Sequence, residues 1–343
     1  MTTMRFANAV RRAVLPAVVV VGTATAVAAQ DGKPEKGPLV LKAQGSFFVG
    51  GETKNVGPNN DYTIHQMYVQ YMIPVGKTGV PVVMVHGCCL SSKSWQQTPD
   101  GRMGWDEYFV RQGHPTYLAD QVSRARSGYD ETVINQVKAG TLPPSSLPSI
   151  FRIGHQGTWT GFRFGPAFGS VYPDEQFPVE AFDEFSKQII PDINSQLDPT
   201  ANPTWTNMAA LANKLGGAVL IGHSESSAFP PRAALIDPSG VRGLIQLETG
   251  CLATLTADQY ATLARIPILI VVADHLAAPP PSASCVTYMT QLRAAGGDVT
   301  FIHLPEIGIH GNSHMMMLDK NNLQVADVLL AWIGEHVEGK NGK

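Results

Sequence analysis

The chain has 343 residues, of which 44% are hydrophobic and 15% charged, and its formal net charge is −3. Such an apolar-rich composition is typical of a globular protein with a large core, and it excludes an intrinsically disordered chain. Lysine and arginine number 25 against 28 acidic residues and form no basic run, so we expect no nucleic-acid partner.

The first 28 residues have the pattern of a signal peptide. Three arginines precede an apolar stretch at residues 13–21, and the small residues at 26–29 offer a cleavage site after Ala28. The apolar stretch is shorter than the roughly 20 residues needed to span a bilayer, so we expect no stable membrane span. The sequence therefore predicts a secreted or periplasmic protein, with the general and twin-arginine export routes both open.

The remaining chain predicts an α/β fold. Residues 46–49 and 62–74 alternate between apolar and polar side chains, which favours an antiparallel start to the sheet. Short apolar runs then follow, with helix-length intervals between most of them, and this pattern is typical of a mostly parallel sheet with helices on both faces. These strands are expected at residues 82–85, 116–119, 218–221, 244–247, 268–272 and 299–304, with a terminal helix near residues 322–336.

One interval is too long for a simple connection. Residues 129–213 are rich in proline, glycine and aromatic side chains, and we expect them to form a lid over one end of the sheet. The alternative is an ordinary surface elaboration. The predicted organisation is a core of residues 29–128 and 214–343 with a lid insertion at 129–213.

A candidate nucleophile follows the strand predicted at 218–221. The sequence Gly222-His223-Ser224-Glu225-Ser226 fits a nucleophile elbow, in which a sharp strand-to-helix turn exposes the serine hydroxyl. Ser226 stands where this motif usually has a second glycine. The alternative is a serine that caps an ordinary helix.

Four late histidines compete for the role of the base that activates this serine: His275, His303, His310 and His314. We favour His314, because it lies in a Gly/Asn/Ser-rich loop after the last strand, where the chain order serine, acid, histidine places the base. His310 is the main rival. Although these two histidines have a spacing found in zinc sites, the residues between them disfavour a helix, and we expect no metal and no cofactor.

Two carboxylates end strands at the same edge of the predicted sheet, Glu248 and Asp274, and either could orient the base. Asp120 follows an earlier strand and is expected to be structural. The loop after the strand at 82–85 is the candidate oxyanion hole, in which the backbone N–H of Cys88 or Cys89 would act with that of Glu225.

The remaining cysteines are Cys251 and Cys285, and export favours pairing of all four. Three pairings are possible. A bond between Cys88 and Cys89 would be strained, because adjacent Cα atoms lie only about 3.8 Å apart.

Several segments resemble the secreted bacterial serine esterases of the α/β-hydrolase superfamily that have a vicinal cystine, the esterase 713-like enzymes. The resemblance extends over nearly the whole mature chain. It rests on residues 86–90, 98–105, 222–224, 248–249 and 311–315.

The resemblance implies an α/β-hydrolase fold and a Ser–His–Glu triad of Ser224, His314 and Glu248. It also implies a disulfide between Cys88 and Cys89 beside the oxyanion hole, which leaves Cys251 to pair with Cys285. The sequence departs from the superfamily pattern at Ser226, and at Ser123 and Ala125, where glycines are more usual.

The implied function is hydrolysis of a small-molecule carboxylic ester through an acyl-enzyme intermediate, and the resemblance favours a homodimer. A serine at the elbow disfavours dehalogenase and epoxide hydrolase chemistry, for which this fold uses an aspartate. A lactonase or thioesterase with the same triad is the nearest alternative. From a different class, a ligand-binding homologue with an inactive elbow is a further alternative.

Overall fold

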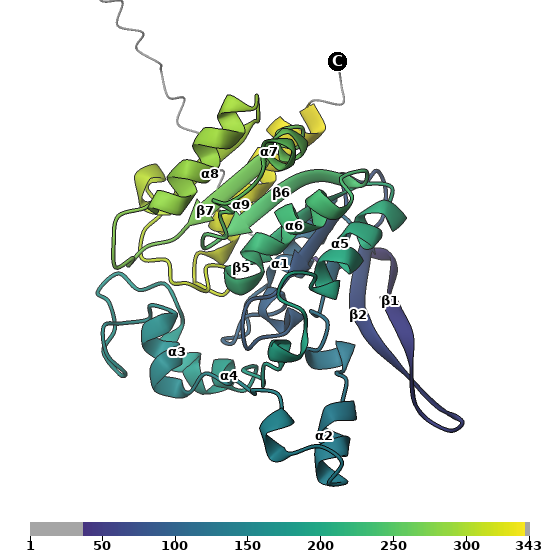
Figure 1. The fold of residues 1–343 in the computed structure, drawn as a ribbon. Coiled ribbons are helices and arrows are strands. Elements are labelled where there is room, and N and C mark those ends of the chain that lie inside the picture. The colour runs from purple at the N-terminus through teal and green to yellow at the C-terminus, as the bar shows by residue number, and fades with distance from the viewer. Residues whose placement is uncertain (1–36, 340–343) are drawn as a thin grey trace, which may run out of the picture. The chain divides into compact units, whose positions relative to one another are not determined.

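The computed structural model describes residues 37–339, so the predicted signal peptide, residues 1–28, lies outside the described residues. In the described range, eight strands form a sheet in the order β1-β2-β4-β3-β5-β6-β7-β8 (Figure 1). The strands are β1 (Leu41–Gly57), β2 (Asn60–Pro74), β3 (Val82–Val85), β4 (Thr116–Ala119), β5 (Ala218–His223), β6 (Val241–Leu247), β7 (Ile268–Val272) and β8 (Val299–His303).

Strand β2 runs opposite to the other seven strands of the sheet. The hairpin β1–β2 is antiparallel and β2 pairs antiparallel with β4, whereas all pairs from β4 to β8 are parallel. This confirms the predicted antiparallel start and mostly parallel sheet. In the register, Val85 at the end of β3 pairs with Gly222 near the end of β5. The loops that follow β3 and β5 therefore leave the sheet side by side.

Helices cover both faces of the sheet, as predicted. Their bounds are α1 (Trp105–Arg111), α2 (Thr132–Lys138), α3 (His155–Gly161), α4 (Phe182–Ser186), α5 (Pro203–Lys214), α6 (Phe229–Ile236), α7 (Ala257–Leu263), α8 (Ala283–Ala294) and α9 (Asn322–Trp332). On one face, strand residues such as Met84 and Ile221 pack with α1 and α9. On the other, the alternate residues Val83 and Leu220 pack with α5 to α8. The period-two side-chain alternation of a strand explains why these runs are apolar throughout.

The interval between β4 and β5 has two parts. In Figure 1, α2, α3 and α4 (teal) lie below the sheet, whereas α5 lies along it beside α6. Buried aromatic residues of the first part, including Trp159 and Phe164, join the core on the α1–α9 face. In the second part, Met208 and Leu211 of α5 join the opposite core. Helix α5 therefore packs on the sheet, whereas α2 to α4 lie beyond it.

Among residues 37–339, no helix is both long enough and apolar enough to cross a membrane.

Candidate active site

Ser224 lies in a sharp turn directly after β5. Its backbone φ is +57°, in the left-handed region that a non-glycine residue rarely adopts. The turn needs small neighbours: a Cβ added to Gly222 would lie 2.0 Å from the carbonyl oxygen of Ser226, and one added to Gly87 would lie 2.9 Å from the Cβ of Ser224. These close approaches explain why the elbow and the loop after β3 both contain glycine.

Ser226 has a role that its hydroxyl explains. Its Oγ accepts a hydrogen bond from the His223 N–H (2.9 Å) and donates one to the carbonyl of Val85 (2.8 Å). The elbow on β5 is thereby tied to the end of β3. Since Ser226 does not have a positive φ, glycine is not required at this position.

Of the four candidate histidines, the structure brings His314 to the serine. Its Nε2 lies 2.8 Å from the Oγ of Ser224. His310 is exposed, His275 stacks on Tyr172 with ring centroids 3.9 Å apart, and His303 lies beside Glu306. His314 is thus the histidine within reach of the Ser224 proton.

Glu248 is the carboxylate beside His314, because its Oε2 lies 3.0 Å from Nδ1 of that ring. Its side chain is only 2% exposed. Burial raises the pKa of Glu248, but the guanidinium of Arg163 and the hydrogen bond with His314 outweigh burial and lower this pKa to about 2. Glu248 is therefore ionised at neutral pH.

The two other candidate acids have different partners. Asp274 accepts hydrogen bonds from the backbone N–H of His275 (2.8 Å) and of Gly311 (3.2 Å). Asp120 accepts from the N–H of Ser92 and from Arg126. Both carboxylates therefore hold loops in place, which agrees with the structural role expected of Asp120.

His223, which precedes Ser224, holds the backbone of His314 in place through a hydrogen bond. His223 is fully buried, and burial lowers its pKa to about 3, so the ring is neutral. Its Nε2–H donates to the carbonyl of His314 at 2.7 Å. The loop that contains His314 is thus attached to the elbow itself.

The predicted oxyanion residues lie around the same turn. Cys88 and Cys89 follow Gly87 in the loop after β3, and Cys89 has a φ of +59°. The Glu225 side chain accepts hydrogen bonds from Asn194 (3.1 Å) and Gln121 (3.2 Å), and burial raises the pKa of its carboxyl. The Glu225 carboxylate is therefore held within a polar network next to Ser224.

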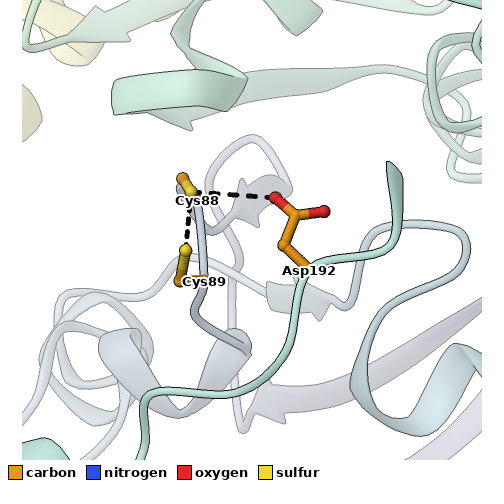
Figure 2. A group of neighbouring side chains, drawn as sticks. All are labelled: Cys88, Cys89 and Asp192. Atoms are coloured by element: carbon orange, nitrogen blue, oxygen red, sulfur yellow. Dashed lines mark hydrogen bonds between the residues drawn. The ribbon is translucent and has the colours of Figure 1, made fainter. Parts of the chain in front are cut away.

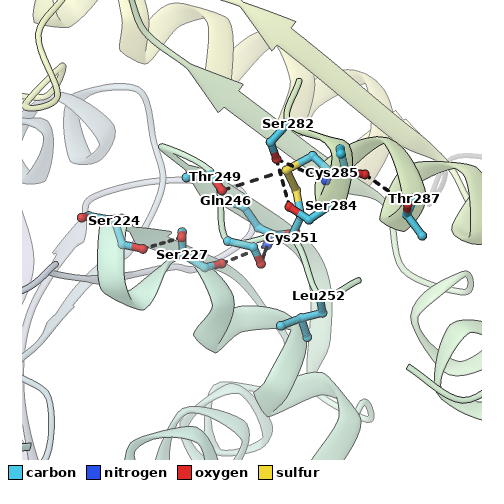
Figure 3. Close-up of a disulfide and its surroundings, with 12 residues drawn as sticks. Ser224, Ser227, Gln246, Thr249, Cys251, Leu252, Ser282, Ser284, Cys285 and Thr287 are labelled. Atoms are coloured by element: carbon cyan, nitrogen blue, oxygen red, sulfur yellow. Dashed lines mark hydrogen bonds between the residues drawn. A yellow bond between two sulfur atoms is a disulfide. The ribbon is translucent and has the colours of Figure 1, made fainter. Parts of the chain in front are cut away.

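The two cysteine pairs differ. Cys251 and Cys285 form a disulfide, as predicted, between the loop after Glu248 and α8. Gln246 connects this loop to the elbow, because it donates to the carbonyls of Gly250 and Ser227. Figure 3 shows Gln246 and Ser227 beside the disulfide. Cys88 and Cys89 are free, and their sulfur atoms lie 2.8 Å apart (Figure 2). The disulfide expected between them is not formed in this structure.

Within residues 37–339, two groups of potential metal ligands lie near the site, Cys88–Cys89–Asp192 and Asp174–Asp274–His275. In the first, the Asp192 carboxylate already pairs with the fully buried Arg124 at 2.7 Å. In the second, Asp274 is used by two backbone N–H groups. The positive charge of Arg124 disfavours a cation at the first group.

Sequence reasoning missed the residues that reach the site from the β4–β5 interval. Arg163 contacts both Glu248 and His314, and the Phe162 ring stacks on His314 with centroids 5.3 Å apart. Phe162 and Arg163 are at least 85 residues away from these partners in the sequence. The only local signal was the aromatic character of the interval, which does not single out an arginine.

Comparison with known proteins extends these observations. No family model matches the chain. The solved structure of a bacterial esterase is 44% identical, covers 88% of this chain and 98% of its own, and superposes with a TM-score of 0.82. A curated probable secreted lipase from a fungal species, phiG, is 27% identical over 84% of this chain and 88% of the lipase. One relative is an esterase and the other a lipase.

Proposed function

The chain belongs to the bacterial esterases of the α/β-hydrolase fold and is an ester-bond hydrolase, and we propose that it works through a triad of Ser224, His314 and Glu248. The observation that supports this most directly is the continuous chain of short contacts, 2.8 Å from Ser224 to His314 and 3.0 Å from His314 to Glu248. A nucleophile, base and orienting acid in this geometry are suited to acyl transfer.

The proposed reaction has two halves. Ser224 Oγ attacks the ester carbonyl while Nε2 of His314 takes its proton, and Glu248 accepts from Nδ1–H and stabilises the imidazolium. The tetrahedral intermediate collapses to an acyl-enzyme, and the alcohol leaves with the proton from His314. Water, activated by the same ring, then attacks the acyl group and releases the carboxylic acid.

The oxyanion formed in each half needs hydrogen-bond donors. We assign them to the backbone N–H groups of Cys88 or Cys89 and of Glu225. The close approach of Gly87 to Ser224 supports this assignment, because it brings the loop after β3 against the nucleophile. Loss of one such donor typically costs roughly 10²- to 10³-fold in kcat.

We further propose that Cys88 and Cys89 become a vicinal disulfide in an oxidising compartment, and that this ring fixes a donor peptide of the oxyanion hole. The 2.8 Å between their sulfur atoms and the resemblance described above support the proposal. Reduction should then cost activity more than stability, so that kcat falls while the melting temperature changes little. The double variant Cys251→Ala/Cys285→Ala is the matched control, because in this variant a reductant can act only on the vicinal pair.

Secretion and the lid also belong to the proposal. Export rests on the pattern of residues 1–28 and is tested by N-terminal sequencing of the mature protein.

We propose that the lid predicted at residues 129–213 functions through its first part, α2 to α4, since α5 packs on the core sheet.

The triad is tested by hydrolysis of a chain-length series of aryl esters. Wild type should hydrolyse at least one of them, Ser224→Ala should be inactive, and Ser239→Ala, at an exposed serine in the turn before β6, should match wild type. Full activity of Ser224→Ala would refute the proposed nucleophile. If wild type is inert on every aryl ester, lactones and thioesters become the substrates to try.

A further inference from the structure

Two consecutive residues after α3 hold the base of the proposed triad. The carbonyl of Phe162 accepts a hydrogen bond from the His314 N–H at 2.9 Å, and its ring stacks on the imidazole at an interplanar angle of 23°. Arg163 follows with a φ of +62°, a rare conformation for a non-glycine residue. This turn directs the arginine side chain to the far end of the same histidine.

The guanidinium group of Arg163 donates two hydrogen bonds and also lies against the His314 ring. Its Nη2 donates to Oε2 of Glu248 at 2.7 Å, and its Nε donates to the backbone carbonyl of Asp274 at 2.8 Å. Its Nη1 lies 3.3 Å from Nδ1 of His314. The side chain is 14% exposed, so water screens these interactions only weakly.

Arg163 and His314 share one carboxylate oxygen. Oε2 of Glu248 receives both Nη2–H of Arg163 and Nδ1–H of His314, whereas Oε1 is occupied by the N–H of Ala273 at 2.9 Å. When His314 takes the proton of Ser224, two cations adjoin one carboxylate. The permanent charge of Arg163 therefore opposes protonation of the ring, while its hydrogen bond fixes the orientation of the acid.

We propose that Arg163 is a positioning residue of the esterase reaction, which fixes Glu248 and sets the acid limb of the pH–rate profile through His314. The proposal rests on the triad proposed above and deepens it. Through Arg163, the segment between β4 and β5 takes part in acid–base catalysis as well as covering the site.

Other titratable groups face this pair, and those that interact with the charge of Arg163 lose this interaction when it is substituted. His223 lies behind His314 and is neutral. Asp319 binds the neighbouring Ser313, and both Asp319 and Glu175 lie close enough to Arg163 to interact with its charge. The backbone carbonyl of Asp274 accepts a hydrogen bond from Arg163, whereas the Asp274 carboxylate accepts from the N–H groups of Gly311 and His275.

The test compares kcat/KM against pH for wild type, Arg163→Met and Arg163→Lys, with Arg102→Met as the matched control. Arg102 donates to the carbonyls of Leu318 and Asp319 in the loop that also contains His314, and it has no contact with the triad. Removal of the Arg163 charge should move the acid limb up by about one pH unit. Arg163→Lys should recover most of this shift, and Arg102→Met should show none.

An unchanged acid limb in Arg163→Met would overturn the inference. An equal shift of the acid limb in Arg102→Met would also overturn it, since the shift would then be a general effect of loosening the loop that contains His314. A second readout does not need turnover. NMR titration of the His314 ring, assigned with His314→Gln, should show a midpoint at higher pH in Arg163→Met than in wild type. Inactivity of wild type on esters would refute the proposed function and leave this titration as a separate test.

Discussion

Ser224 and His314 meet at 2.8 Å, yet they are supported in different ways. The serine is held by its own strand, by the neighbouring strand β3 and by Ser226 two positions along the chain. The histidine lies in a loop without regular structure, which Phe162 and Arg163 hold from the interval between β4 and β5 and Asp319 holds from within the loop. The comparison shows that the sheet determines where the nucleophile lies, whereas tertiary contacts determine where the base lies.

The largest expected effect is at the residue that orients the base. Glu248→Gln keeps the shape of the side chain but removes the charge that stabilises the imidazolium, so kcat should fall roughly 10³- to 10⁴-fold. Steady-state kinetics on the best aryl ester measures this. A loss of less than tenfold would mean that Glu248 is not the acid partner and would reopen the case for Asp274.

The loop that contains His314 is tested through Asp319. This fully buried carboxylate accepts from the N–H of Ser313 (2.8 Å), from its hydroxyl (2.6 Å) and from Asn312 (2.9 Å). Asp319→Ala leaves these donors buried without a partner and should cost about 3 kcal/mol of unfolding free energy. Because the loop shifts, kcat should also fall roughly 100-fold.

Denaturant unfolding and kinetics measure both effects. Should Asp319→Ala fail to fold, Asp319→Asn can be used instead. This variant keeps one acceptor oxygen and should show smaller losses of both unfolding free energy and kcat. Unchanged kcat in a destabilised variant would show that this loop does not depend on Asp319 for its position.

The elbow is tested by a smaller substitution. Ser226→Ala removes the hydroxyl between His223 and Val85 and should cost about 1–2 kcal/mol of stability. Since β3 and β5 still pair around it, kcat should fall less than about tenfold. A loss of kcat as large as that of Asp319→Ala would break the comparison, because the elbow would then depend on side-chain contacts as strongly as the loop does.

The smallest effect is expected outside both regions. Ala125 is exposed and has a φ of +47°, and it is one of the three positions where the sequence lacks an expected glycine. Ala125→Gly relieves this conformation and should stabilise the fold by up to about 1 kcal/mol without changing kcat. Ser123, with a φ of +62°, is buried, so its substitution would also remove packing. A lower melting temperature in Ala125→Gly would contradict the strain argument.

Prediction from sequence succeeded where the signal was local. The short apolar runs predicted the parallel strands, and the elbow pattern predicted a sharp turn at Ser224, which the structure shows directly after β5. The choice between Glu248 and Asp274 was not local, since both follow buried strands at the same edge of the sheet. Only the resemblance favoured Glu248, and in the structure it is Glu248 that contacts His314.

Contacts across long sequence separations were beyond prediction. Arg163 lies 85 residues from Glu248 and 151 from His314 along the chain, so no periodicity or motif relates them. The same holds for Arg124, which is fully buried against Asp192. Such pairs depend on how the interval between β4 and β5 folds back onto the sheet, and that information is distributed over the whole core.

The most direct test of the central claim is covalent labelling with a fluorophosphonate ester, followed by mass spectrometry of the digested protein. Such reagents react with a serine that a neighbouring base activates. The account predicts one phosphonyl group per chain on the peptide that contains Ser224, and strongly slowed labelling in His314→Ala. Labelling at another residue, or labelling of Ser224 at the same rate without His314, would contradict it.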